Sequence, residues 1–243
     1  MEANNSLAVI LAAGKGTRMS ESVPKPLVQV NGSSIISWII NSFKKNNIDV
    51  ALVINPKHKT FFDSYKNLVQ FVYQKNQNGT GHAVMKASKI IDKYEHIYVF
   101  VGDSPFVGSK IIFKMFKEHI DTSSDVTILS SIFKNKKFPY ARIIRDVKGN
   151  VEKIVEEIDA NDKELENTEL FCSHYLFKSE TLINYLPKLK NNSKTGEIYF
   201  TDILNELIFD KKNINSLIIH NWKRLVGLNT KQDIKWIESQ KII

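Results

Sequence analysis

The stretch LAAGKGTRMSESVPKPL, residues 11–27, decides how the chain folds and what kind of ligand it can hold. It follows residues 7–11, a short apolar and β-branched run that is typical of a buried strand. The small residues at 12–14 and 16 let the backbone turn tightly after this strand, so that its amide groups can approach phosphate oxygens. A strand followed by such a turn predicts a phosphate-binding loop in an α/β protein.

Two basic side chains make this loop more specific than a glycine-rich turn. Arg18 offers a planar fork that matches phosphate geometry, and Lys25 offers a compact charge on a flexible stem. Pro24 and Pro26 restrict the backbone of Lys25 and so lower the entropy lost when its amine is held. The dinucleotide fingerprint would need a third glycine where Met19 stands, and GxxxxGK[ST] is absent. A lone GxG favours an ordinary turn, but the two cations favour a triphosphate clamp.

The rest of the chain alternates strand-like and helix-like segments, which predicts an α/β fold with a Rossmann-like, mostly parallel sheet. The expected strands are residues 7–11, 50–54, 71–73, 96–101 and 126–131, then 141–145, 151–156 and 171–177. The expected helices are residues 33–45, 81–91, 109–119, 179–186, 199–209 and a last one from 231 onward. The shorter strands after residue 131 predict a small lobe that forms the wall for a second substrate.

Composition limits the classes of protein that remain. A chain of 243 residues with 42% hydrophobic content can bury the core of one large domain. The net charge of +8 comes from lysines spread along a Lys- and Asn-rich chain, so we expect no nucleic-acid partner. The single cysteine, Cys172, agrees with a reducing compartment. No run reaches membrane-spanning length and no signal peptide is evident, so we expect a cytoplasmic protein without a membrane partner.

Two further motifs follow expected strands, at the sheet edge where ligands of open α/β folds bind. Gly79, Thr80 and Gly81 open a helix, where amides and a hydroxyl could grip a base or a phosphate. Asp103 follows the strand at 96–101, and its carboxylate could hold Mg²⁺. Taken alone, the first motif could be a helix cap and the second a turn acid.

Taken together and in this order, LAAGKGTRM, PKPL, QNGTGHA, VGDSP, IVEEIDA, ENTE, TGEIYFTDIL and VGLN resemble the sugar-1-phosphate nucleotidyltransferases. The resemblance is closest to the N-terminal uridylyltransferase domain of the bifunctional N-acetylglucosamine-1-phosphate enzyme. It runs from about residue 7 to residue 229. The first block is shared by many nucleotidyltransferases, whereas GTGHA together with GEIYFTD is more particular.

The resemblance implies a role for each matching residue. It implies triphosphate binding and catalysis at the α-phosphate by Arg18 and Lys25. The implied nucleotide-binding residues are Leu11, Ala13, Gly14, Gln74, Gly79 and Thr80, of which the last three match positions that recognise uracil. The implied Mg²⁺ ligands are Asp103 and Asn229, and the implied sugar-binding residues are Ala141, Glu156 and Asn167.

The implied reaction is attack of a sugar 1-phosphate, N-acetylglucosamine 1-phosphate by the closest resemblance, on the α-phosphorus of UTP, with pyrophosphate leaving, in nucleotide sugar biosynthesis for the cell envelope. Catalysis then depends on aligning two anions and neutralising their repulsion. The implied organisation is one domain, with a nucleotide-binding half at about 1–130, a sugar-binding half at about 131–229 and a C-terminal helix at 230–243. We expect no acetyltransferase β-helix domain, and a homo-oligomer stays open.

Departures from the family pattern leave alternatives for the substrates. Ala141 stands where the close family has glycine and could narrow the space beside the sugar. Glu169 replaces the glycine of NTG, so its charge needs a polar partner or points away. PKPL also occurs among guanylyl and other nucleotidyl relatives. CTP, GTP, dTTP or another phosphorylated acceptor therefore remains an alternative, as does a nucleotide-binding module without turnover.

Overall fold

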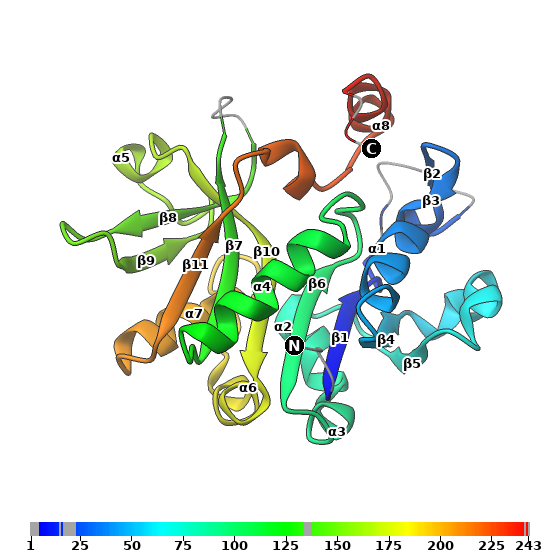
Figure 1. The fold of residues 1–243 in the computed structure, drawn as a ribbon, viewed down its shortest axis with the longest axis horizontal. Coiled ribbons are helices and arrows are strands. Elements are labelled where there is room, and N and C mark those ends of the chain that lie inside the picture. Colours follow the sequence, from blue (N-terminus) through cyan, green and yellow to red (C-terminus); the bar gives the residue numbers. More distant parts are fainter. Residues whose placement is uncertain (1–4, 15, 17–22, 134–137, 241, 243) are drawn as a thin grey trace.

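The computed structural model of the protein describes residues 5–14, 16, 23–133, 138–240 and 242. A path of seven strands runs through its central sheet. The order is β11-β7-β10-β6-β1-β4-β5 (Figure 1). These strands are β1 (Ser6–Leu11), β4 (Asp49–Ile54), β5 (Gln70–Tyr73), β6 (His96–Val101), β7 (Val126–Ile132), β10 (Glu169–Lys178) and β11 (Ile214–Ile218). Only β10 runs antiparallel to its neighbours along this path. The predicted mostly parallel sheet is thus confirmed.

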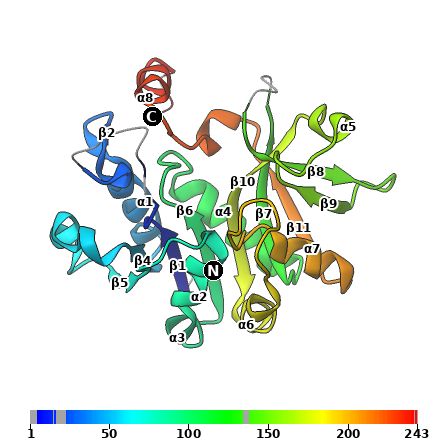
Figure 2. The same cartoon turned by 180° about the vertical axis from the view of Figure 1, so that it is seen from behind.

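Helices cover both faces of this sheet. One face carries α1 (Ile35–Lys44) and α4 (Ser109–Asp121), which lie in front of the sheet in Figure 1. The other carries α2 (Thr80–Lys86), α3 (Ser88–Ile91), α6 (Ser179–Tyr185) and α7 (Asp202–Phe209), in front in Figure 2. The alternation in β1 explains the two layers, since Ala8 and Ile10 enter one core and Leu7 and Val9 the other. The strands are therefore apolar on both faces.

A β-hairpin extends the sheet on the β10 side. It consists of β8 (Ala141–Arg145) and β9 (Val151–Val155), and β8 pairs with the start of β10. The short helix α5 (Asp162–Leu165) lies beside the hairpin (Figure 1). A small ribbon of β2 (Gln29–Val30) and β3 (Ser33–Ser34) precedes α1, and α8 (Lys231–Glu238) follows near the C-terminus. Short 3-10 helices complete the fold at Lys25–Leu27, Pro56–Tyr65, Leu186–Lys188 and Trp222–Leu225.

The observed elements differ from the expected ones at specific contacts. The helix expected over 81–91 is divided into α2 and α3 at Ala87. The helix expected from residue 199 begins only at Asp202. The amide of Phe200 donates to Thr80 Oγ1, and this contact holds the residues just before Asp202 in a turn outside the helix. Strand β11 and the 3-10 helix at Pro56–Tyr65 were not predicted. In the described part of the chain, no helix is long and apolar enough to cross a membrane.

Candidate active site

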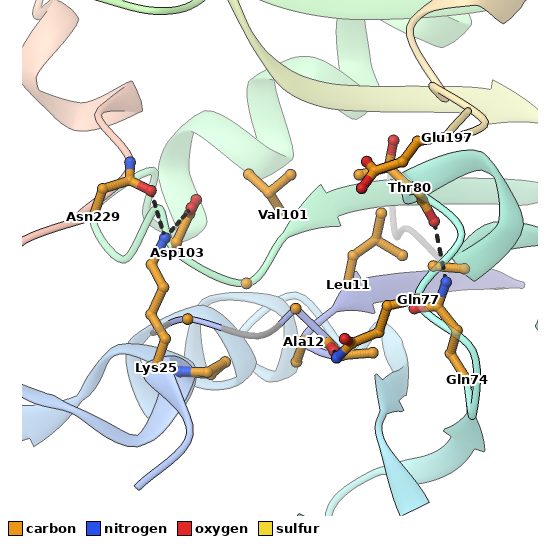
Figure 3. A pocket seen from close by; sticks show the side chains of 17 residues that line it. Leu11, Ala12, Lys25, Gln74, Gln77, Thr80, Val101, Asp103, Glu197 and Asn229 are labelled. Carbon is orange, nitrogen blue, oxygen red and sulfur yellow. Dashed lines mark hydrogen bonds and ion pairs between the residues drawn. The ribbon is translucent and has the colours of Figure 1, made fainter. Parts of the chain in front are cut away.

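A cavity of about 440 Å³ opens beyond the carboxyl ends of β1 and β6 (Figure 3). The turn after β1 forms its floor, and the segments after β5 and β6 form its sides. Its lining includes Leu11, Ala12, Ala13, Gly14, Gly16, Lys25, Pro26, Gln74, Gln77, Gly79, Thr80, Ala83, Val101, Gly102, Asp103, Glu197 and Asn229. A site at this edge is what a sheet of parallel strands favours. We call it the nucleotide cavity, after the ligand that the family resemblance implies.

Three side chains from distant parts of the sequence meet at one end of this cavity. Lys25 Nζ lies 2.6 Å from Asp103 Oδ2 and 2.9 Å from Asn229 Oδ1 (Figure 3). Lys25 opens a 3-10 helix, Asp103 follows β6, and Asn229 immediately precedes the cap of α8. The side chains of Lys25 and Asp103 are only 15% and 25% exposed, so their charges interact more strongly than a surface pair would.

Two glycines let Asp103 reach this position. A Cβ at Gly102 would lie 2.7 Å from the carbonyl oxygen of Leu11, to which the Gly102 amide donates at 2.9 Å. A Cβ at Gly227 would lie 2.8 Å from Asp103 Oδ1. Leu228 donates its amide to the Asp103 carbonyl at 2.9 Å. The chain thus packs tightly on both sides of the carboxylate and fixes its direction.

The start of α8 fixes Asn229. Asp233 Oδ2 accepts hydrogen bonds of 2.7 Å from the amides of Asn229 and Thr230. The Thr230 hydroxyl in turn accepts from the amide of Asp233, which completes a capping box. A helix-start motif therefore holds the backbone of Asn229, leaving its carboxamide directed at Lys25.

The other end of the nucleotide cavity presents the amide of Gln74. Its Nε2 donates to the Gly79 carbonyl at 3.1 Å and lies 3.0 Å from His82 Nδ1. A carbonyl only accepts, so this end of the amide is the NH₂ group and His82 Nδ1 is an acceptor. Burial and the charge of Lys86 lower the pKa of His82, which agrees with a neutral ring. Gln74 Oε1 is then the atom able to accept from a base.

The two most particular motifs of the sequence are joined here. The Gly81 amide donates to the Ile198 carbonyl, and the Ile198 amide donates to the Asn78 carbonyl, both at 2.9 Å. Gly79 has φ +98° and a Cβ there would lie 2.4 Å from the Ile198 carbonyl oxygen. Gly79 is also the N-cap residue of α2. Gly79 therefore has both of the roles considered for this motif: it caps α2 and it lines the nucleotide cavity.

A second cavity of about 160 Å³ adjoins the first. We call it the acceptor cavity, after the substrate that the family resemblance implies. It is lined by Val101, Asp103, Ser104, Pro139, Tyr140, Ala141, Glu156, Phe171, Cys172, Ser173 and Gly227. Val101 and Asp103 line both cavities. Burial raises the pKa of the Cys172 thiol well above its usual range, so Cys172 is a poor nucleophile.

Glu156 is the half-buried acid of the acceptor cavity. Burial raises its pKa, a hydrogen bond from Thr201 opposes the shift, and the nearby Asp202, Asp159 and Glu157 raise it further. Thr201 Oγ1 also lies 3.2 Å from the hydroxyl of Tyr175. Thr201 therefore links the carboxyl group to the core.

Two other residues, Asn167 and Glu169, are held by hydrogen bonds to neighbouring strands. Asn167 does not line the acceptor cavity; its amide donates to the Ile143 carbonyl at 2.9 Å, and its oxygen accepts from the Glu169 amide at 2.7 Å. Glu169 points to Arg145, which donates to its two carboxylate oxygens at 2.7 and 2.5 Å, and Ser130 adds a third bond. The charge of Glu169 is thus paired away from both cavities.

The other residues that the resemblance implied for the site line one of the two cavities, except for Arg18. Leu11, Ala13, Gly14 and Thr80 line the nucleotide cavity, and Ala141 lines the acceptor cavity. Arg18 lies outside the described residues. The sequence did not single out Val101, Gln77, Glu197 or Tyr140, which line one or both cavities. Glu197 lies within the GEIYFTD motif, so this motif was the sequence signal that could have pointed to it.

The oxygens of Asp103 and Asn229 form the best candidate for a metal site. The described residues hold no group of three or more His, Cys, Asp and Glu side chains that could bind a metal. Mg²⁺ in nucleotide enzymes takes one or two carboxylates together with water and phosphate oxygens. The two oxygens converge on the cationic ammonium of Lys25, so their arrangement already favours positive charge. The donor set therefore fits Mg²⁺ bound together with a triphosphate.

The fold and cavities define an α/β protein with two adjoining cavities at the carboxyl edge of a mostly parallel sheet. The family described as "Nucleotidyl transferase" matches residues 7–236, so the chain belongs to this family, as predicted.

Two curated relatives and one solved structure extend the comparison. The bifunctional protein GlmU of Acholeplasma laidlawii is 34% identical over 224 residues, covering 91% of this chain and 48% of the relative. That of Clostridium tetani is 34% identical over 235 residues, covering 96% and 51%. The chain thus spans about half the length of these curated relatives. A putative glucose-1-phosphate thymidylyltransferase from Bacillus anthracis, solved in complex with a sucrose, has a TM-score of 0.75 at 18% identity. The match covers 96% of this chain and 94% of that chain, and it shows that the fold is shared.

Proposed function

We propose that the chain transfers a uridylyl group from UTP to N-acetylglucosamine 1-phosphate in the cytoplasm, releasing pyrophosphate. The observation that supports it best is that the nucleotide and acceptor cavities meet at Val101 and Asp103. Substrates in the two cavities would bring an acceptor phosphate and an α-phosphate together beside Lys25. Positioning of this kind supplies much of the catalysis in phosphoryl-type transfer.

The hydrogen bonds of Gln74 support a uracil base in preference to cytosine. Uracil carries a hydrogen on N3, which Gln74 Oε1 could accept, whereas cytosine offers a lone pair there. The amide is held in this orientation by Gly79 and His82. A buried acceptor that loses its partner is penalised by about 1–3 kcal/mol. UTP is therefore preferred over CTP.

Positive charge at the α-phosphate is the task of Lys25, with Arg18 in the same role by family resemblance. Bound between Asp103 and Asn229, Mg²⁺ would supply positive charge next to the triphosphate oxygens. The acceptor phosphate is already a nucleophile, so no side chain needs to be activated. A binding module without turnover would not need Lys25, Asp103 and Asn229 brought together in this way.

Glu156 and Ala141 are proposed to recognise the sugar, because both line the acceptor cavity. Asn167 would then act indirectly, by holding the strand that carries Glu169. The methyl group of Ala141 occupies room in a cavity of only about 160 Å³. This favours a second candidate, a smaller sugar 1-phosphate without the acetamido group.

The test is a pyrophosphate-release assay that combines UTP, CTP, GTP and dTTP with N-acetylglucosamine 1-phosphate and glucose 1-phosphate. We expect UTP with N-acetylglucosamine 1-phosphate to give the highest kcat/KM. Faster turnover with glucose 1-phosphate would favour the second candidate. No turnover with any pair, despite measurable nucleotide binding, would contradict the transferase function.

A further inference from the structure

Lys25 occupies the place where a cation would bind to Asp103 and Asn229. Its Nζ lies 2.6 and 2.9 Å from the two oxygens proposed as metal ligands. A Mg²⁺ ion held by the same two oxygens would lie beside the ammonium, at a separation where two positive charges repel strongly. Binding of the ion therefore disfavours the contacts of Lys25 with these oxygens.

We propose that Lys25 and a divalent cation exchange at these oxygens: Lys25 holds Asp103 and Asn229 ready, and the arriving cation releases its ammonium toward the triphosphate. The exchange rests on the proposed function, because it assumes that Asp103 and Asn229 are the metal ligands. Beyond that function, the exchange gives Lys25 two partners in succession, first Asp103 and Asn229 and then the triphosphate.

The surroundings of Lys25 allow the side chain to move while the backbone stays in place. Pro24 and Pro26 restrict the backbone on either side. A Cβ at Gly16 would lie 2.6 Å from Lys25 Cβ, so the loop after β1 packs directly on the start of the side chain. Lys25 also lines the nucleotide cavity. Rotation of its flexible stem would therefore move the ammonium within that cavity.

The exchange predicts that nucleotide and cation help each other to bind. Without nucleotide, an arriving cation must break both hydrogen bonds of Lys25, and this cost weakens the binding of the cation. A triphosphate offers the released ammonium a new partner and removes this penalty. By linkage, the cation must then strengthen nucleotide binding by the same factor. Removing the ammonium should strengthen cation binding in the absence of nucleotide and reduce this coupling.

The experiment measures binding of Mn²⁺ alone by the EPR signal of the free ion, which needs no turnover. We expect Lys25→Met to bind Mn²⁺ about tenfold more tightly than the unchanged protein, and Asp103→Asn added to Lys25→Met to abolish the gain. Lys45→Met, at a lysine outside the nucleotide cavity, is the matched control and should change nothing. Circular dichroism checks the fold of each variant.

Equal or weaker Mn²⁺ binding by Lys25→Met would overturn the exchange, because a lysine that only supports the fold would weaken the site when removed. Absence of binding in every variant would overturn it too. Tighter binding by Lys25→Met in a protein that transfers no nucleotide would instead leave the exchange standing and contradict the proposed function.

Discussion

Gly227 lies directly against the carboxylate of Asp103: a Cβ on Gly227 would be 2.8 Å from Oδ1 and 3.1 Å from Cγ. Real Cβ atoms do not approach other atoms this closely, so any side chain at position 227 must displace Asp103. The amide of Gly227 is also held, because it donates to the hydroxyl of Tyr140 at 3.0 Å. The glycine therefore sets the position of the carboxylate.

We expect Gly227→Ala to lower kcat at least tenfold while the protein stays folded. The added methyl pushes Asp103 away from Lys25 and Asn229, and a shift of about 1 Å at a reacting centre can cost a hundredfold. Steady-state assays and a thermal melt check this result. Lys223→Ala, four residues earlier in the same segment, should leave kcat unchanged; full activity of Gly227→Ala would show that the position of Asp103 is not critical.

Lys25→Ala should lower kcat about a hundredfold, which corresponds to about 3 kcal/mol of transition-state stabilisation. The fold should be nearly unaffected, since the ammonium contacts only Asp103 and Asn229 among the described residues. Pyrophosphate release by the purified variant measures the effect. A variant with almost full activity would remove Lys25 from the mechanism.

The pH dependence of stability should report on Glu156. Burial raises its pKa in the folded protein, so its contribution to stability is greatest below the unfolded pKa, about 4.3. That contribution is lost as the pH rises through the raised folded value, because the charged form is poorly solvated. Glu156→Gln should therefore raise Tm relative to the unchanged protein, and increasingly so from pH 4 to pH 8. Glu152→Gln, at an exposed position of β9, should show no such trend.

The pair of Arg145 and Glu169 should matter for stability and not for the acceptor. The Glu169 side chain is 9% exposed and accepts from both Arg145 and Ser130. Removing one member of a buried ion pair lowers the free energy of unfolding by about 3–5 kcal/mol. Because the Arg145 side chain is 25% exposed, we expect a loss at or below the lower end of this range. We expect Glu169→Ala to lower the free energy of unfolding by about 2–3 kcal/mol.

The KM for the sugar 1-phosphate should stay the same in Glu169→Ala, since Glu169 lines neither cavity. A double-mutant cycle with Arg145→Ala isolates the pair energy from the loss of packing. A large rise in KM with unchanged stability would mean that Glu169 acts on the acceptor after all.

Much of this arrangement was predictable because parallel strands bring their carboxyl ends to one edge. The loop after β1 and the acid after β6 had to meet there once the strands were recognised, and β1 and β6 are direct neighbours. Asn229 could be placed only through family resemblance, since no local pattern ties it to that edge. The structure joins it to Lys25 by a hydrogen bond that spans 204 positions in the sequence.

Other features depend on contacts that a sequence pattern cannot show. Strand β11 is mixed in polarity, INSLI, and its pairing with β7 is what makes it a strand. Arg145 and Glu169 are 24 residues apart and meet because β8 pairs with β10. The close approach of Gly227 to Asp103 likewise arises only when the segment before α8 crosses the end of β6.

Gln74 gives the sharpest test of base selection. Its Nε2 is bound to Gly79 and His82, so only its oxygen faces a base. Gln74→Leu keeps a similar volume and removes that acceptor, so kcat/KM for UTP should fall about 10- to 100-fold, matching a loss of about 1–3 kcal/mol. CTP never gained from this oxygen, so its kcat/KM should change little and the preference for UTP should shrink.

Competition between UTP and CTP in one reaction measures this preference directly. Gln70→Leu, an exposed position on the same strand, is the matched control and should keep the original ratio. Equal losses for both nucleotides in Gln74→Leu would show that Gln74 shapes the cavity without reading the base. A loss confined to UTP would identify the Gln74 oxygen as the atom that distinguishes uracil from cytosine.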